Sequence, residues 1–189
     1  MQHASVSGEL PMFRFSPNAY ELGLFEVEDG TCQSCGLRRS MRYTSSFYSV
    51  EEVSYICPWC VADGTAARVF DGEFTDRASI DGVPHDRTLP ITVDEVEAEE
   101  VATRTPSFPS WQQGGWRSHC GRPCAFLGDI GSSDLARYLE EPDFLADVNG
   151  GLGWDPDLIR TRLRAAGDLA GYLFRCMTCD AHRLHVDAS

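Results

Sequence analysis

The sequence contains no lysine, and all 16 of its basic residues are arginine. Its 29 acidic residues outnumber them, so the formal net charge is −13. Nucleic-acid binding needs clustered Lys and Arg side chains that neutralise phosphates, so this composition argues against a nucleic-acid partner. The same charge would attract a strongly basic protein and speed its association. Genome composition or a high-salt cytoplasm would also explain the charge without any partner.

Long hydrophobic runs are also absent from the sequence. No segment approaches the roughly 18 consecutive apolar residues of a membrane span. Residues 1–12 have neither the basic region nor the apolar stretch of a signal peptide. We therefore expect a cytoplasmic protein without a membrane span, in which thiols stay reduced.

The familiar sequence motifs of catalysis are missing as well. There is no GxSxG nucleophile elbow, no phosphate-binding P-loop and no HExxH metalloprotease motif. The hydrophobic fraction of 42% is enough for a packed core, but metal sites would help to stabilise it. We therefore predict a folded protein that is not an enzyme.

Cysteine is what the sequence does contain in an ordered pattern. The eight cysteines form four close pairs: Cys32 and Cys35, Cys57 and Cys60, Cys120 and Cys124, and Cys176 and Cys179. Where thiols stay reduced, such pairs are typical of metal ligands. We predict two zinc ions, one held by the first two pairs and the other by the last two. Four protein ligands would leave no open position for water or substrate, so both sites would be structural.

Two alternatives concern the same residues. The CPWC motif of Cys57 and Cys60 follows an apolar segment and precedes an expected helix, as in thiol redox proteins with a lowered thiol pKa. The nearby first cysteine pair argues against that interpretation, because a redox motif needs no second pair. In addition, His119, His182 or His185 would be able to replace a cysteine as a zinc ligand.

The pattern of apolar residues predicts an α+β fold with small antiparallel, zinc-ribbon-like hairpins and several short helices. We expect strands at 41–50, 171–175 and 182–186, a strand-like alternation from Val53 to Cys57, and helices at 61–70, 92–104, 132–140 and 155–166. Thr92 and Glu95 fit a capping box for the second of these helices. The last two strands would form a hairpin with the final cysteine pair at its tip. We divide the chain into an N-terminal ribbon-like module (1–76), a linker or variable loop (77–91) and a C-terminal helical part with the closing zinc hairpin (92–189).

Acidic and aromatic residues are the candidates for partner contacts. The acidic candidates are Asp94, Glu95, Glu97, Glu99, Glu100, Glu140, Glu141 and Asp143. On helices such residues are most simply a solvated face. Trp59, Trp111 and Trp116 would either pack in the core or form an exposed contact surface.

Several segments together resemble the CbrC family of bacterial proteins. They are CQSCG, YSVEEV, CPWCVADGTAARVFDGEFTD, TRTPSFPSWQQGGWRSHCGRPCAFLG and GYLFRCMTCDAHRLHVD. The family has no established enzymatic activity, and its name comes from an association with colicin tolerance. The resemblance implies a small cytoplasmic bacterial protein that protects against a toxin. Together with the negative net charge, it predicts an immunity-like protein that binds a basic partner such as a nuclease toxin. An adaptor in a stress or envelope response is the alternative. The family's cysteine pattern carries over to all eight positions, and Asp180 departs from it where a glycine is usual.

Overall fold

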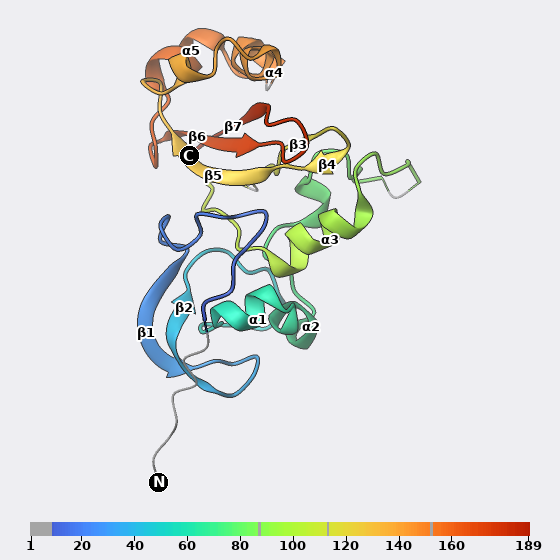
Figure 1. Cartoon of the computed structure of the whole chain (residues 1–189), viewed down its shortest axis with the longest axis vertical. Helices are drawn as coiled ribbons and strands as arrows, with labels where there is room; N and C mark the ends of the chain where they lie inside the picture. The colour runs from blue at the N-terminus through green and yellow to red at the C-terminus, as the bar shows by residue number, and fades with distance from the viewer. Residues whose placement is uncertain (1–8, 87, 113, 152) are drawn as a thin grey trace.

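The computed structural model describes residues 9–86, 88–112, 114–151 and 153–189. It shows the expected α+β architecture of small antiparallel sheets and several short helices (Figure 1). A two-stranded hairpin and two short helices lie at one end of the molecule, and a three-stranded sheet lies toward the other. Helix α3 lies between these two parts (Figure 1).

The N-terminal part is built around a β-hairpin and a chain of aromatic rings. Strand β1 (Phe25–Thr31) pairs antiparallel with β2 (Arg38–Tyr43). Phe25 and Tyr43 face each other in this pairing, and their ring centroids lie 5.5 Å apart. Tyr43 in turn makes an edge contact with buried Phe74 at 5.2 Å. These rings belong to the same hydrophobic core as Cys32, Cys57 and Cys60.

The expected strands of this part were only partly correct. β2 ends at Tyr43, and the alternating segment from Val53 to Cys57 forms no strand. The side chain of Gln33 explains part of the difference, because its Oε1 accepts hydrogen bonds from the backbone N–H groups of Ser54 and Tyr55 (2.7 and 2.9 Å). These two donors are therefore not available to a strand ladder.

The single helix expected at 61–70 is two helices. α1 (Pro58–Ala62) and α2 (Thr65–Phe70) are separated at Gly64, whose φ of +71° lies in the left-handed region. The N-cap of α2 is Gly64, and the Asp63 carboxylate before it accepts a hydrogen bond from Thr65 N at 2.8 Å.

The segment expected to be a linker contains ordered contacts. It holds a 3₁₀ turn, η1 (Arg77–Ser79), and the buried Ile80, which forms an isolated bridge with Trp116. Arg87 of this segment lies outside the described residues. The division of the chain at 77–91 stays a prediction.

Helix α3 (Glu95–Arg104) covers the junction between the two parts of the molecule (Figure 1). The capping box expected from Thr92 and Glu95 was wrong. Asp94 is the N-cap instead, and its carboxylate accepts a hydrogen bond from Glu97 N at 3.0 Å. Because Asp is a short and charged acceptor next to the first turn, it caps this helix without help from Thr92.

The C-terminal part is a three-stranded antiparallel sheet with a core on each face. Its strands are β5 (Ala125–Ile130), β6 (Leu169–Arg175) and β7 (His182–Ala188), in the order β5-β6-β7. Tyr172 and Phe174 pack on one face, whereas Leu173 and Leu184 pack on the other. The predicted β6–β7 hairpin is confirmed, with the last cysteine pair at its tip. A short hairpin of β3 (Ser118–His119) and β4 (Arg122–Pro123) precedes the sheet.

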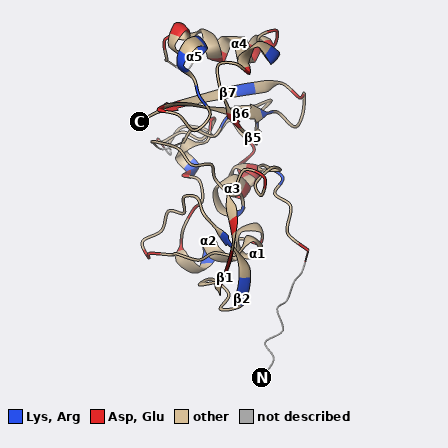
Figure 2. Cartoon of the chain, turned by 90° about the vertical axis from the view of Figure 1, so that its left-hand side faces the viewer, with Lys and Arg blue, Asp and Glu red and all other residues tan. Residues whose placement is uncertain are grey.

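Short helical segments cover the second face of this sheet (Figures 1 and 2). They are η2 (Leu135–Arg137), α4 (Pro142–Ala146), the π-helical turn η3 (Asp147–Gly151) and α5 (Pro156–Arg162). The helix expected at 132–140 is therefore only a 3₁₀ turn. The helix expected at 155–166 begins as predicted, with Asp155 accepting a hydrogen bond from Asp157 N at 2.8 Å, but it ends at Arg162.

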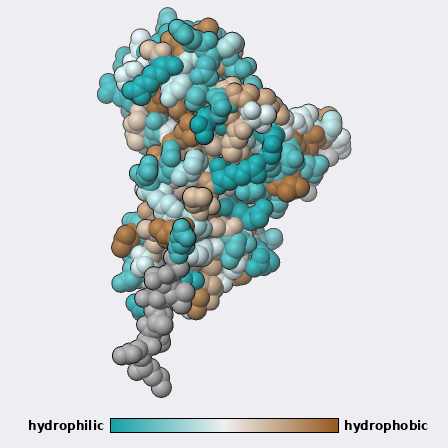
Figure 3. Space-filling model, in the orientation of Figure 1, coloured by the Kyte–Doolittle hydropathy of each residue, from teal (hydrophilic) through white to brown (hydrophobic). Residues whose placement is uncertain are grey.

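None of the described helices is long and apolar enough to cross a membrane. On the face drawn in Figure 3, hydrophobic residues are scattered among hydrophilic ones.

Candidate metal centres

The first candidate centre, called here the N-terminal cluster, consists of Cys32, Cys35, Cys57 and Cys60. The first pair lies in the turn between β1 and β2, and the second pair lies at the start of α1. Gly36 closes the turn with a φ of +70°, and its N–H donates to the carbonyl of Cys32 at 2.8 Å. A glycine is favoured at this position because other residues rarely adopt that backbone conformation.

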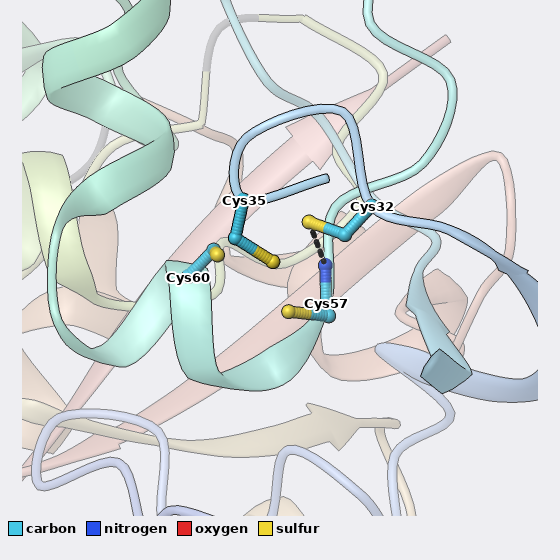
Figure 4. A group of neighbouring side chains, drawn as sticks. All are labelled: Cys32, Cys35, Cys57 and Cys60. Carbon is cyan, nitrogen blue, oxygen red and sulfur yellow. Dashed lines mark hydrogen bonds between the residues drawn. The ribbon is translucent and has the colours of Figure 1, made fainter. Parts of the chain in front are cut away.

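The four sulfur atoms of the N-terminal cluster converge on one point (Figure 4). They all lie within 4.8 Å of one another. With Zn–S bonds of about 2.3 Å, the sulfurs of a tetrahedral site are about 3.8 Å apart, so this donor set fits such an ion. Three of the four cysteines are buried, and Cys35 is partly exposed. The cluster is thus part of the N-terminal core.

The four thiols of this cluster interact strongly with one another. Hydrogen bonds from the thiols of Cys57 and Cys60 hold the pKa of Cys32 far below its usual range. Contact with Cys32 raises the pKa of Cys57 to about 11, and it raises that of Cys60 further. A bound dication would require all four thiols to be deprotonated.

The burial and the pKa shifts of these thiols also concern the redox interpretation of the CPWC motif. A redox CxxC needs an exposed thiol whose pKa is lowered. Cys57 and Cys60 are both buried, and the pKa of each is raised. The structure thus places both thiols of the motif, buried, in a four-sulfur cluster, and the redox interpretation stays a prediction.

The second candidate centre, called here the C-terminal cluster, consists of His119, Cys120, Cys176 and Cys179. The Nδ1 atom of His119 lies 3.3 Å from Cys120 Sγ and 3.2 Å from Cys179 Sγ. The two sulfurs of Cys120 and Cys179 are 3.6 Å apart. Three sulfurs and one imidazole nitrogen are a common tetrahedral zinc donor set.

Two tight turns position the ligands of the C-terminal cluster. Cys120 and Gly121 connect β3 to β4, and both have a positive φ (53° and 69°), as in the type I′ turn of a hairpin. At the tip of the β6–β7 hairpin, Asp180 has a φ of 60° and donates its N–H to Cys176 O at 3.0 Å. Asp180 thus adopts the conformation that a glycine has at the corresponding Gly36.

The predicted ligand set is corrected at Cys124. The structure groups His119, instead of Cys124, with Cys120, Cys176 and Cys179. Cys124 is buried in the core below the sheet, next to Trp116, whose indole N–H donates to Cys124 O at 2.9 Å. Burial raises the pKa of the Cys124 thiol to about 12. The type I′ turn reverses the chain between Cys120 and Cys124, so the two side chains of this CxxxC do not meet at one point.

The structure also separates the roles of the three candidate histidines. His119 directs Nδ1 toward the sulfurs, and its Nε2 lies 3.2 Å from Asp143 Oδ2. A carboxylate on the second nitrogen is the usual way to orient a metal-binding imidazole. His182 instead pairs with Glu141, at 2.9 Å between Nδ1 and Oε1.

His185 is partly buried beside the aromatic rings of Phe108 and Tyr172 and belongs to neither cluster. Its Nε2 accepts a hydrogen bond from Gly115 N at 3.2 Å. Burial, followed by the nearby Arg117, lowers the pKa of His185 to about 4. The ring is therefore neutral at physiological pH and serves as a packed acceptor.

Most of the eight acidic residues predicted to contact a partner have neighbours within the chain. Asp94 caps α3, and Asp143 lies against His119. The remaining contacts are ion pairs: Glu97 with Arg14 and Arg122, Glu100 with Arg14 and Arg104, Glu95 and Glu99 with Arg77, and Glu141 with His182. Glu140 has no ion pair among the described residues. Figure 2 shows acidic and basic residues interspersed along the chain. Arginine thus offsets much of the negative charge of α3.

A buried carboxylate that the sequence did not single out supports the C-terminal cluster. Asp147 is 2% exposed and accepts hydrogen bonds from Arg117 (3.0 Å), from Arg183 (2.8 Å at each oxygen) and from Leu184 N (2.9 Å). Arg183 also donates to Ser118 O at 3.1 Å. The network therefore joins β3, which carries His119, to β7, which follows Cys179. No short motif in the sequence predicts it, because its members lie far apart along the chain.

Comparison with known proteins places the chain in a family. It matches the model of an "Uncharacterised protein family (UPF0167)" over residues 10–188. The UPF0167 proteins Mb2317 of Mycobacterium bovis and MT2352 of Mycobacterium tuberculosis are each 38% identical to it, over 99% of this chain and 98% of the relative. The UPF0167 protein PA1536 of Pseudomonas aeruginosa is 35% identical, over 94% and 97% respectively.

No solved structure matches the chain. The relatives carry UPF0167 names, with which the resemblance to CbrC proteins is consistent, and the link to colicin tolerance stays a prediction. The match to the family model and the near full-length alignment with these relatives together show that this chain belongs to the UPF0167 family.

Proposed function

We propose that the protein is a non-catalytic binding protein whose fold is held by two structural zinc ions. The observation that carries this proposal is the completeness of both donor sets, each with four ligand atoms within 4.8 Å of one another. Zinc suits thiolate and imidazole ligands in a tetrahedron better than magnesium or calcium, which prefer oxygen. Four protein ligands leave no open position for an activated water.

In this proposal each cluster joins two segments that are distant in the sequence. The N-terminal cluster ties the β1–β2 turn to the start of α1, and the C-terminal cluster ties the β3–β4 turn to the β6–β7 tip. Zinc, when bound, supplies the charge that keeps the thiols deprotonated. His119 enters the second set as a neutral imidazole, with its Nε2 directed to Asp143.

Metal counting on the whole chain tests this assignment. Native mass spectrometry of the unmodified protein should find two zinc ions per chain. His119→Ala should retain one ion, because it removes a ligand from the C-terminal cluster alone. Cys124→Ala is the matched control and should retain two. A chain without metal would contradict the proposal, and loss of an ion in Cys124→Ala alone would restore the four-cysteine arrangement.

A basic protein partner, such as a nuclease toxin, is the finer part of the proposal. It is supported by the net charge of −13, which would speed association with a positively charged surface. The ion pairs of α3 mean that this attraction would come from the whole surface rather than from that helix alone. The test is the association rate with a toxin encoded by a neighbouring gene, at low and high salt. No binding at low salt would contradict a basic partner, while binding insensitive to salt would favour an adaptor role.

A further inference from the structure

A β-bulge in β5 places a carboxylate on the aromatic face of the C-terminal sheet. Phe126 pairs with Phe174, and Gly128 pairs with Leu173, so two steps along β5 match one step along β6. Since side chains alternate between faces, the extra residue reverses the orientation of the later residues in β5. Asp129 therefore lies directly opposite Tyr172, and their side chains share one face.

The backbone at the bulge has little freedom to change. Gly128 has a φ of +136°, and a Cβ added there would lie 2.9 Å from Leu22 Cδ2. A residue other than glycine would be strained at this φ, and the end of the Leu22 side chain would have to shift. Bulges of this kind commonly re-aim a side chain toward a functional site.

A small cavity lies over this face, away from both cysteine clusters. Its volume is about 220 Å³, and its walls are mainly apolar and aromatic, formed by Pro109, Ser110, Trp111, Asp129, Ala166, Ala170 and Tyr172. Trp111 is 54% exposed, yet its indole N–H donates to Gly167 O at 2.8 Å. The ring is thus held in place at the cavity wall instead of being free to turn.

The cavity contains one acidic side chain, for which the described residues provide no matching cation. Asp129 is the one charged residue among the described lining residues, and no ion pair of Asp129 occurs in the described part of the chain. The buried Asp187 lies opposite Ala170, on the same face of the sheet, and adds a second carboxylate nearby. Burial raises the pKa of the Tyr172 phenol, and the charges of Asp129 and Asp187 raise it further.

We propose that this cavity binds a small organic cation, namely a protonated or methylated amine carried on a short apolar chain. The carboxylate of Asp129 would pair with the charge, and the face of Trp111 would attract it through its π-electrons. The apolar walls would receive the alkyl chain. Small-molecule sites of this type combine mostly apolar walls with a few convergent polar groups. The inference does not depend on metal at either cluster.

Two probes of equal size test the proposal on the unmodified, metal-loaded chain. The indole N–H signal of Trp111, assigned with Trp111→Phe, is followed by ¹H–¹⁵N NMR during titration with n-butylammonium and, separately, with n-butanol. We expect a saturable shift with n-butylammonium and binding of n-butanol about tenfold weaker. Equal affinities, or no saturable shift with n-butylammonium, would overturn the proposal whether or not any variant folds.

A matched pair of variants then locates the charge. Asp129→Asn keeps the shape of the side chain and should weaken n-butylammonium about tenfold while leaving n-butanol unchanged. Asp157→Asn is the control, because Asp157 is exposed on α5, over the opposite face of the sheet. Equal affinity of the unmodified chain and Asp129→Asn for n-butylammonium would assign its binding to another site.

Discussion

The two cysteine clusters differ in how far each lies inside the protein. In the N-terminal cluster, Cys32, Cys57 and Cys60 are themselves members of the aromatic core. In the C-terminal cluster, Cys120 and Cys179 are exposed, and only Cys176 reaches a core. The N-terminal cluster therefore lies in a hydrophobic core, whereas the C-terminal cluster lies at the tips of two hairpins.

This difference indicates what each half of the molecule needs. The N-terminal half has a two-stranded hairpin and two short helices, and three cysteines of its cluster are part of its single core. The C-terminal half has a three-stranded sheet with cores on both faces and the Asp147 network. We therefore expect metal to be essential for folding in the first half and to order only the hairpin tips in the second.

The largest expected effect is that of Cys57→Ser. Structural zinc in small domains contributes about 10–16 kcal/mol, which exceeds the total stability of most domains, about 5–15 kcal/mol. The variant should bind one zinc ion fewer and lose hydrogen-exchange protection throughout β1 and β2, while β6 and β7 stay protected. Cys124→Ala serves as the control cysteine variant. Persistent protection of β1 and β2 would show that the N-terminal core folds without its cluster.

Asp147→Ala should have the next largest effect, and it probes the support of the C-terminal half. Removing one partner of a buried ion pair costs about 3–5 kcal/mol, because the remaining charge is left buried. Here Arg117 and Arg183 would lose their shared carboxylate. Denaturant unfolding measures the change in the free energy of unfolding. Asp157→Ala, on exposed α5, should cost less than about 1 kcal/mol. Similar costs for the two variants would mean that the network adds little.

Cys179→Ser should have a smaller effect on stability, because the loss is confined to an exposed turn. We expect one zinc ion fewer and faster hydrogen exchange around 176–182, with the rest of the sheet unchanged. Thr178→Ser, in the same turn, should retain both ions. Global unfolding of Cys179→Ser would remove the proposed difference between the two clusters.

The sequence predicted the elements whose signals are local. The β6–β7 hairpin followed from an alternating pattern on both sides of a cysteine pair, and α3 ends before Pro106 because the residue preceding proline disfavours the helical region. The break at Gly64 escaped prediction, since good helix formers on its C-terminal side outweighed one glycine. Helix existence was thus more predictable than helix boundaries.

The candidate sites divide in the same way. All four members of the N-terminal cluster were predicted, because two CxxC motifs at ribbon spacing carry a strong signal. In the C-terminal cluster, the grouping of all eight cysteines into four pairs favoured Cys124 over His119. The spacing CxxxC does not reveal a turn with two positive φ angles. The adjacency of His119 to Cys120 was the available signal. No sequence signal indicated that Asp143 and Asp147 support this cluster, because their partners are distant in sequence.

The smallest expected effect concerns Asp143, whose carboxylate lies against the imidazole of His119. Loss of such a carboxylate typically weakens metal binding about 10–100-fold, since it leaves the ring less well oriented. Asp143→Asn should therefore weaken zinc at the C-terminal cluster alone, as measured by competition with a chelator. Glu140→Gln, which removes a nearby carboxylate that has no ion pair with any described residue, should leave both affinities unchanged. Equal weakening by the two variants would indicate a general charge effect and would remove Asp143 from its positioning role.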